Sequence, residues 1–166
     1  MHLTDRMVEY DNWLTDRLLE AASQLSDESL DEPVRLTPTT EAFDEEAPSI
    51  RSMLNRLVFT KEMWSAAISG RAFAGGDDRS IDGMRSRLDT SGREFVELVT
   101  DIDKRDAWDT AFVDALCEPP ESFTFGGAVS HVLSWDAYRR QVVAAVLKAK
   151  GVEVPSADPI VWDRER

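Results

Sequence analysis

The chain has 166 residues, 42% of them hydrophobic, which fits a single domain over residues 1–166 whose core needs no disulfide or metal. It carries 19 Lys and Arg against 32 Asp and Glu, and the formal net charge of -13 disfavours binding to nucleic acids or anionic membranes. Cys117 is the only cysteine, and the sequence shows neither a signal peptide nor the ~20-residue apolar run of a membrane span. We therefore expect a cytoplasmic protein with no membrane or nucleic-acid partner.

A first helix is predicted for residues 3–25, where apolar side chains recur in steps of three and four. The positions expected to face the core are Leu3, Met7, Tyr10, Leu14, Leu18, Ala21 and Leu25. A polar connection containing Pro33, Pro38 and Pro48 follows and is too long for a tight turn. Such a length allows the chain to cross the end of the helices.

Two more helices are predicted in the middle of the chain. Ser49 is placed to cap a second helix that stops at Gly70, and Ser80 is placed to cap a third helix after the turn at Gly75 and Gly76. The core-facing positions of the second helix are Ile50, Met53, Leu54, Leu57, Val58, Trp64 and Ile68. Those of the third are Ile81, Met84, Leu88, Ser91, Phe95, Leu98 and Ile102.

The last long helix is predicted from Phe125 to Lys150, ending at Gly151. Before it, residues 107–113 favour an extended chain and the Pro119-Pro120 pair forbids a helix. Residues 152–166 are expected to form an extended tail on the surface. Because four amphipathic helices need one another to bury their apolar faces, the predicted fold is all-α, a four-helix bundle.

The last helix places a charge in its own apolar face. Ala128, Val132, Trp135, Arg139, Val142 and Val146 follow the spacing that keeps side chains against a neighbouring helix. Arg139 is therefore predicted to point inward. Since a guanidinium stays charged at any relevant pH, it needs an anionic partner, a ligand or a route to water.

Several stretches of the sequence resemble the DinB-like superfamily, four-helix proteins that include metal-dependent hydrolases and thiol transferases. The stretches are residues 10–13 of the first helix, residues 49–64 of the second, residues 124–141 of the last, and residues 158–162 of the tail. The resemblance covers almost the whole chain. It implies an up-down-down-up order of the helices and commonly a homodimer.

The resemblance also implies a site for a divalent metal such as zinc or nickel, held by one histidine on the second helix and two on the last. The matching positions of this chain are Arg56, Trp135 and Arg139. A guanidinium has no lone pair to offer and an indole is not a metal ligand. His2 and His131 are the only histidines, so one chain cannot supply three imidazoles. We therefore expect a degenerate site with no metal and no other cofactor.

Two interpretations of these positions stay open. In the first, Trp135 fills the former metal cavity and the arginines pair with carboxylates such as Asp11, Glu62 or Asp136. In the second, the two arginines and the indole of Trp135 converge in the former pocket and hold a small carboxylate, phosphate or sulfonate in bidentate fashion. Buried guanidiniums about 5 Å apart would repel by ~3 kcal/mol at an effective dielectric constant of about 20, so either interpretation needs a negative group beside them. The candidate pocket residues are Asp11, Asn55, Arg56, His131, Trp135, Asp136 and Arg139.

Three functions follow from these alternatives, and the sequence assigns no catalytic residue to any of them. The first is a metal-free, dimeric binding or regulatory protein that takes a small anionic molecule in the pocket. The second is a metal-dependent hydrolase or thiol S-transferase of the DinB-like class, with an atypical metal site built from His131 and carboxylates. The third is a structural dimer partner, with the tail at the interface.

Overall fold

The computed structural model describes residues 2–36, 40–73 and 75–165, so Pro38 lies outside the described residues. The described chain is mostly helical, with one small two-stranded sheet. Its elements are α1 (Leu3–Ala22), α2 (Asp27–Asp31), α3 (Ile50–Ile68), α4 (Ile81–Lys104), β1 (Ala111–Asp114), β2 (Glu121–Thr124), α5 (Phe125–Ala149) and α6 (Pro159–Glu165). None of these helices is long and apolar enough to cross a membrane.

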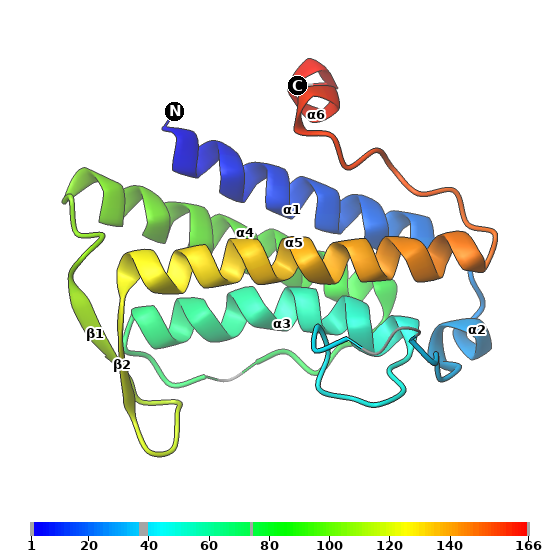
Figure 1. The fold of residues 1–166 in the computed structure, drawn as a ribbon, viewed down its shortest axis with the longest axis horizontal. Helices are drawn as coiled ribbons and strands as arrows, with labels where there is room; N and C mark the ends of the chain where they lie inside the picture. Colours follow the sequence, from blue (N-terminus) through cyan, green and yellow to red (C-terminus); the bar gives the residue numbers. More distant parts are fainter. Residues whose placement is uncertain (1, 37–39, 74, 166) are drawn as a thin grey trace.

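Four long helices lie side by side and form the body of the molecule (Figure 1). Each of α1 and α3 packs against both α4 and α5, whereas α1 and α3 barely touch. In Figure 1, α1 and α5 run in one direction and α3 and α4 in the other. The segment between α3 and α4 returns along the length of the molecule, because two successive helices with the same direction need such a crossover.

Side-chain caps begin three of these helices. The hydroxyl groups of Ser49, Ser80 and Thr124 each accept a hydrogen bond from the backbone N–H three residues on, which satisfies one of the free donors at a helix start. The caps predicted at Ser49 and Ser80 are thus confirmed. At the start of α5, a β-carbon on Gly126 would lie 3.0 Å from the backbone oxygen of Trp108, a tight contact that the glycine avoids.

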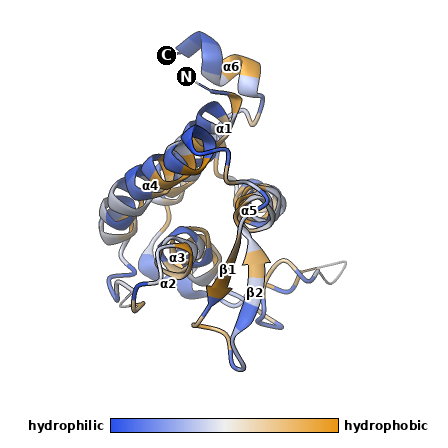
Figure 2. Cartoon of the chain, turned by 90° about the vertical axis from the view of Figure 1, so that its left-hand side faces the viewer, coloured by the Kyte–Doolittle hydropathy of each residue, from blue (hydrophilic) through white to orange (hydrophobic). Residues whose placement is uncertain are grey.

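The hairpin before α5 and the C-terminal tail differ from the prediction. The extended chain expected near residues 107–113 is confined to β1, which pairs with β2 in an antiparallel hairpin beside α3 and α5 (Figure 2). The expectation of an extended tail over residues 152–166 is wrong for its second half, because α6 forms there. Trp162 of α6 is buried against Tyr10 of α1, with ring centroids 5.8 Å apart, and this contact gives the short helix a surface to fold on.

The core-facing side of α1 also differs from the prediction. Leu3 and Met7 are 74% and 46% exposed, and the side chains that turn inward one position later are Val8, Asp11 and Thr15. Leu14, Leu18 and Ala21 are buried as predicted, so the prediction fails only toward the start of the helix. The buried residues of α1 include three polar ones, Asp5, Asp11 and Thr15, which a search for apolar periodicity passes over.

The core is built in three layers along the helices. One apolar cluster joins the C-terminal half of α1 to the beginning of α3 and the end of α5, with Leu18, Leu54, Leu57, Leu88 and Val143 among its members. A second joins the opposite ends of the same helices, with Val8, Trp64, Phe95, Val99 and Val132 among its members. On each of α1, α3 and α5 a buried charged residue separates the two clusters. The middle layer is therefore polar.

Candidate functional site

The middle layer contains five charged residues that are almost completely buried. Asp11 comes from α1, Lys61 from α3, and Asp136, Arg139 and Arg140 from α5, and none is more than 3% exposed. We call these five residues the buried charge layer. Charges are rarely tolerated at this depth unless they are paired and hydrogen-bonded.

Within the layer each carboxylate contacts two cations. The Lys61 Nζ atom lies 2.5 Å from Asp11 Oδ2 and 3.3 Å from Asp136 Oδ2, so the lysine bridges α1 and α5 from its place on α3. Arg140 pairs with the other oxygen of Asp11. Arg139 Nη1 lies 3.3 Å from Asp136 Oδ1. Two of the predicted residues, Asp11 and Asp136, are thus brought together, but through the ammonium group of a residue that was not predicted.

The two carboxyl groups respond differently to this environment. Burial acts to raise the pKa of Asp11, but the attraction of Lys61 and Arg140 outweighs it and the pKa falls below the ordinary value of 3.8. The pKa of Asp136 is raised, chiefly because burial disfavours its charged form. The attraction of Lys61 does not compensate for burial, and the negative charge of Asp11 raises the pKa further. Asp11 is therefore the anion on which the layer chiefly depends.

Arg139 points inward as predicted, and its donors are used within the protein. Its Nε atom donates to the backbone oxygen of Ala42 at 2.8 Å, and its Nη1 atom donates to Thr60 Oγ1 at 3.1 Å as well as to Asp136. The guanidinium thereby ties α5 to α3 and to the connection that precedes α3. This arrangement is the first of the two interpretations, in which an internal carboxylate balances the arginine.

Arg56 occupies a different environment although it matches the same set of positions. Its side chain is 31% exposed and its Nη2 atom lies 3.4 Å from Asp44 Oδ2, beyond the usual length of a charged hydrogen bond. Its Nε atom is buried and has no hydrogen-bond partner among the described residues. The guanidinium carbon lies 5.5 Å from the ring centroid of Phe59, a cation–π distance.

A small hollow of about 220 Å³ opens beside this side chain. We call it the Arg56 hollow; its lining includes Asp44, Ser52, Asn55, Arg56, Phe59 and Arg79. Asn55, another predicted residue, lies on its wall and accepts a hydrogen bond from Arg87 at 2.8 Å through Oδ1. Glu45 also lines the hollow and accepts a hydrogen bond from the Ser52 hydroxyl at 3.2 Å. The lining thus includes two arginines, two carboxylates, an amide and a hydroxyl.

Trp135 and His131 lie along the outer side of α5 rather than in a cavity. The His131 ring is 5.3 Å from the Trp64 ring and 6.1 Å from the Trp135 ring, centroid to centroid. The Arg139 guanidinium carbon lies 5.9 Å from the Trp135 centroid, so the indole covers the buried arginine. Burial lowers the pKa of His131 below 6.5, and the positive charges of Arg139 and Arg56 lower it further.

These side chains do not fit a divalent metal. Arg56, Trp135 and Arg139 offer no lone pair suited to a metal, and the histidine nearest to them lies between two indoles and near two cations. Over the part of the chain that the structure describes, no group of three His, Cys, Asp or Glu side chains is arranged to hold an ion. We therefore assign no metal chemistry to this site.

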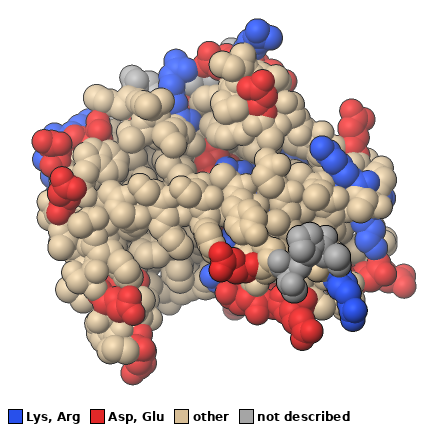
Figure 3. All heavy atoms as spheres, in the orientation of Figure 1, with Lys and Arg blue, Asp and Glu red and all other residues tan. Residues whose placement is uncertain are grey.

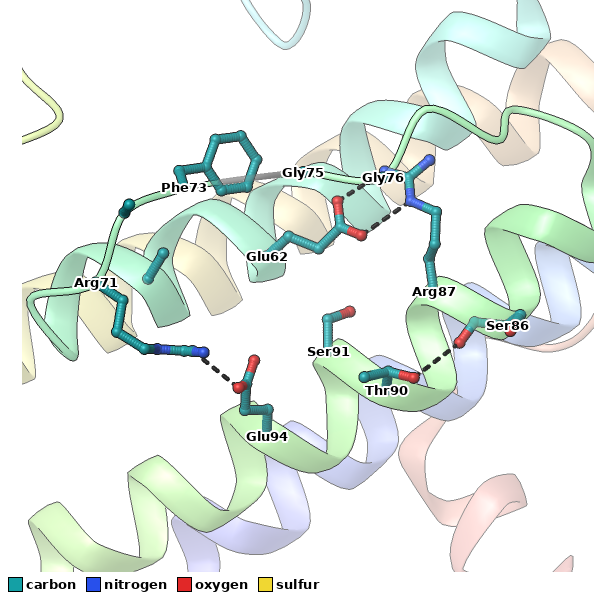
Figure 4. A pocket seen from close by; sticks show the side chains of 12 residues that line it. Glu62, Arg71, Phe73, Gly75, Gly76, Ser86, Arg87, Thr90, Ser91 and Glu94 are labelled. Carbon is teal, nitrogen blue, oxygen red and sulfur yellow. Dashed lines mark hydrogen bonds and ion pairs between the residues drawn. The ribbon is translucent and has the colours of Figure 1, made fainter.

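A second hollow lies between α3, α4 and the segment that joins them, and its volume is about 360 Å³ (Figure 4). At one end Arg87 donates to both oxygens of Glu62, at 2.9 and 2.7 Å. At the other end Arg71 lies 2.8 Å from Glu94. We call it the Ser91 hollow after the serine of α4 at its centre.

The residues that sequence reasoning missed are Lys61, Arg140 and Asp44. Lys61 carried a usable signal, because it falls four residues after Leu57 and three before Trp64, within the predicted apolar face of that helix. Asp44 lies in the acidic connection before α3, and nothing in its sequence neighbourhood indicates that it meets Arg56. Comparison with models of known families and with characterised proteins gives no match to this chain.

Proposed function

We propose that the protein is a DinB-like four-helix bundle without a metal centre, and that it binds a small anion in the Arg56 hollow. The order and direction of α1, α3, α4 and α5 support the bundle assignment (Figure 1). The residue types at the positions implied for metal ligands support the absence of a metal.

One observation carries the choice of Arg56 over Arg139 as the binding residue. Arg139 has a backbone oxygen, a hydroxyl and a buried carboxylate as partners, whereas the single ion pair of Arg56 is long and its buried Nε–H is without a partner among the described residues. A buried donor left unsatisfied costs about 1–3 kcal/mol, which an incoming acceptor recovers. Of these two arginines, Arg56 is the one with a donor to spare.

The size of the hollow and the spare donor of Arg56 define the ligand. Its volume of about 220 Å³ is below the range of about 300–1,000 Å³ typical of drug-sized ligands, so a compact carboxylate, phosphate or sulfonate fits best. Arg79 and Glu45 also line the hollow, so the choice of an anion rests on the spare donor of Arg56 and not on a surplus of positive charge. Asp44 stands where an incoming anion would approach Arg56, and its 79% exposed side chain is free to give way.

Isothermal titration with acetate, phosphate and methanesulfonate tests this proposal. Arg56→Gln should abolish binding, and Asp44→Asn should strengthen it because it removes the competing carboxylate. Arg93→Gln is the matched control, since Arg93 is an exposed arginine of α4 paired only locally with Asp89. Equal affinities for the wild type, R56Q and R93Q, or no saturable binding of any of the three anions, would refute the assignment.

We further propose that the protein forms a homodimer through the outer face of α5. The whole helix is described, and its exposed positions carry no charged side chain before Lys148. Figure 3 shows this face as a band of uncharged atoms in a molecule of net charge -13. Two such chains repel through most of their surfaces, so an uncharged face is where a second copy meets least resistance.

Light scattering after size-exclusion chromatography tests the dimer. Ala137 is exposed in the middle of this face, and Ala137→Glu should shift a dimeric mass to a monomeric one. Glu94→Ala on α4, away from α5, should leave the mass unchanged. A monomeric wild type, or a dimer that tolerates A137E, would contradict the proposal.

A further inference from the structure

The Ser91 hollow contains a polar group that the fold leaves unused. Ser91 is 3% exposed and its hydroxyl has no hydrogen-bond partner among the described residues. In Figure 4 its side chain points from α4 into the space between α3 and α4. A buried hydroxyl without a partner is uncommon, because the lost hydrogen bonds to water are not replaced. Because Ser91 lines the hollow, a polar group that enters it would supply the missing partner.

Two glycines of the segment between α3 and α4, Gly75 and Gly76, lie close to side chains that line the hollow. A β-carbon on Gly75 would come within 2.4 Å of the Phe73 ring, and one on Gly76 within 2.6 Å of the Arg87 side chain. These two glycines therefore let Phe73 and Arg87 pack tightly against the backbone that covers the hollow. Phe73 is in turn held by Phe59 of α3, with ring centroids 5.0 Å apart.

The charges around the hollow cancel. Glu62 and Arg87 form a two-point pair that is only 11–14% exposed, and Arg87 also donates to Asn55 Oδ1 and to the backbone oxygen of Asp78. Arg71 and Glu94 neutralise each other at the rim. Two guanidiniums and two carboxylates leave no net charge, so the hollow has no electrostatic preference for an ionic guest.

We propose that the Ser91 hollow binds a compact uncharged molecule with several hydroxyl groups, such as a monosaccharide or a polyol. A hydroxyl both donates and accepts, so one ligand can donate to the free lone pairs of Glu62 and accept from the guanidiniums and Ser91. Phe73 offers an apolar ring to the C–H side of such a molecule. A volume of about 360 Å³ lies at the lower end of the range for small-molecule sites. This site is separate from the Arg56 hollow and does not depend on anion binding there.

Ligand-observed NMR with D-glucose, myo-inositol, D-ribose and glycerol tests the proposal, with glycine as a charged comparison ligand. We expect saturable binding of at least one hydroxylated compound. Ser91→Ala should weaken it about three- to tenfold, which corresponds to the loss of one neutral hydrogen bond. Arg71→Ala opens the rim and should also weaken it.

Ser65→Ala is the matched control. Ser65 is equally buried on α3 and its hydroxyl also lacks a hydrogen-bond partner among the described residues, but it does not line the hollow. Both Ser→Ala variants should fold with an unfolding midpoint at or above that of the wild type, because each removes an unsatisfied hydroxyl. Binding of glycine alone, equal affinities of S91A and S65A, or no binding of any hydroxylated compound would each overturn the proposal.

Discussion

Replacing Asp11 by asparagine probes the buried charge layer at the residue on which it chiefly depends. The carboxylate is 1% exposed and contacts Lys61 at 2.5 Å together with Arg140. An amide keeps the shape but not the charge, so Arg140 loses its ion-pair partner and Lys61 keeps only Asp136, at 3.3 Å. Removing one partner of a buried ion pair typically costs about 3–5 kcal/mol. We expect D11N to lower the free energy of unfolding by that amount.

Asp16→Asn on the same helix is the matched control. Asp16 pairs with Arg85 at 2.7 Å, but both side chains are 38–40% exposed, and exposed pairs contribute about 0–1 kcal/mol. Urea denaturation measures both variants against the wild type, with unchanged slopes showing that the folded and unfolded states are comparable. A cost for D11N within 1 kcal/mol of that for D16N would show that the layer does not hold the helices together. Lys61→Met combined with D11N should cost less than the sum of the two single changes.

Three further outcomes follow from the same contacts. The pKa of Asp11 is lowered in the folded state, so its contribution to the free energy of unfolding is present above pH 3.8 and is lost as the pH falls through the folded-state pKa. Urea denaturation at a series of pH values should therefore show the difference in stability between wild type and D11N shrinking below pH 3.8. A constant difference would contradict this. Arg56→Gln removes one of the cations that lower the pKa of His131, so NMR titration should find that pKa closer to 6.5, and an unchanged value would argue against the proximity. Gly151 has a φ of +79°, so Gly151→Ala should cost about 1–2 kcal/mol in urea denaturation, and a neutral effect would contradict the helix end described here.

Much of the helical framework could be predicted because it rests on local signals. Serine caps and terminal glycines are chosen by backbone geometry within a few residues, so α3, α4 and α5 begin and end close to where the sequence places them. The face that α1 buries was harder, because its inner positions include Asp11 and Thr15. The helix at residues 159–165 depends on packing against Tyr10, a contact across most of the chain that no local pattern contains.

The sequence identified several residues of the site but not how they are arranged relative to one another. The inward position of Arg139 and its partner Asp136 follow from spacing along a single helix. The exposure and the long ion pair of Arg56 could not be predicted in this way. They depend on Asp44, which the long connection before α3 brings to this arginine. The spacing of Lys61 is compatible with a core-facing position, but a lysine at such a position also fits the solvent-exposed edge of a helix. Its partners, Asp11 on α1 and Asp136 on α5, are known only once these helices are packed against α3.

The most direct test of the account is NMR observation of the arginine Nε–H groups during a titration with phosphate. Arg56 and Arg139 match positions of the same implied metal site, and of these two Arg56 is the one whose buried Nε–H has no partner among the described residues. We predict that the Arg56 signal shifts to saturation while the Arg139 signal, held by the Ala42 oxygen, stays in place. Movement of Arg139 in place of Arg56, or no saturable movement of either, would contradict the proposed anion site.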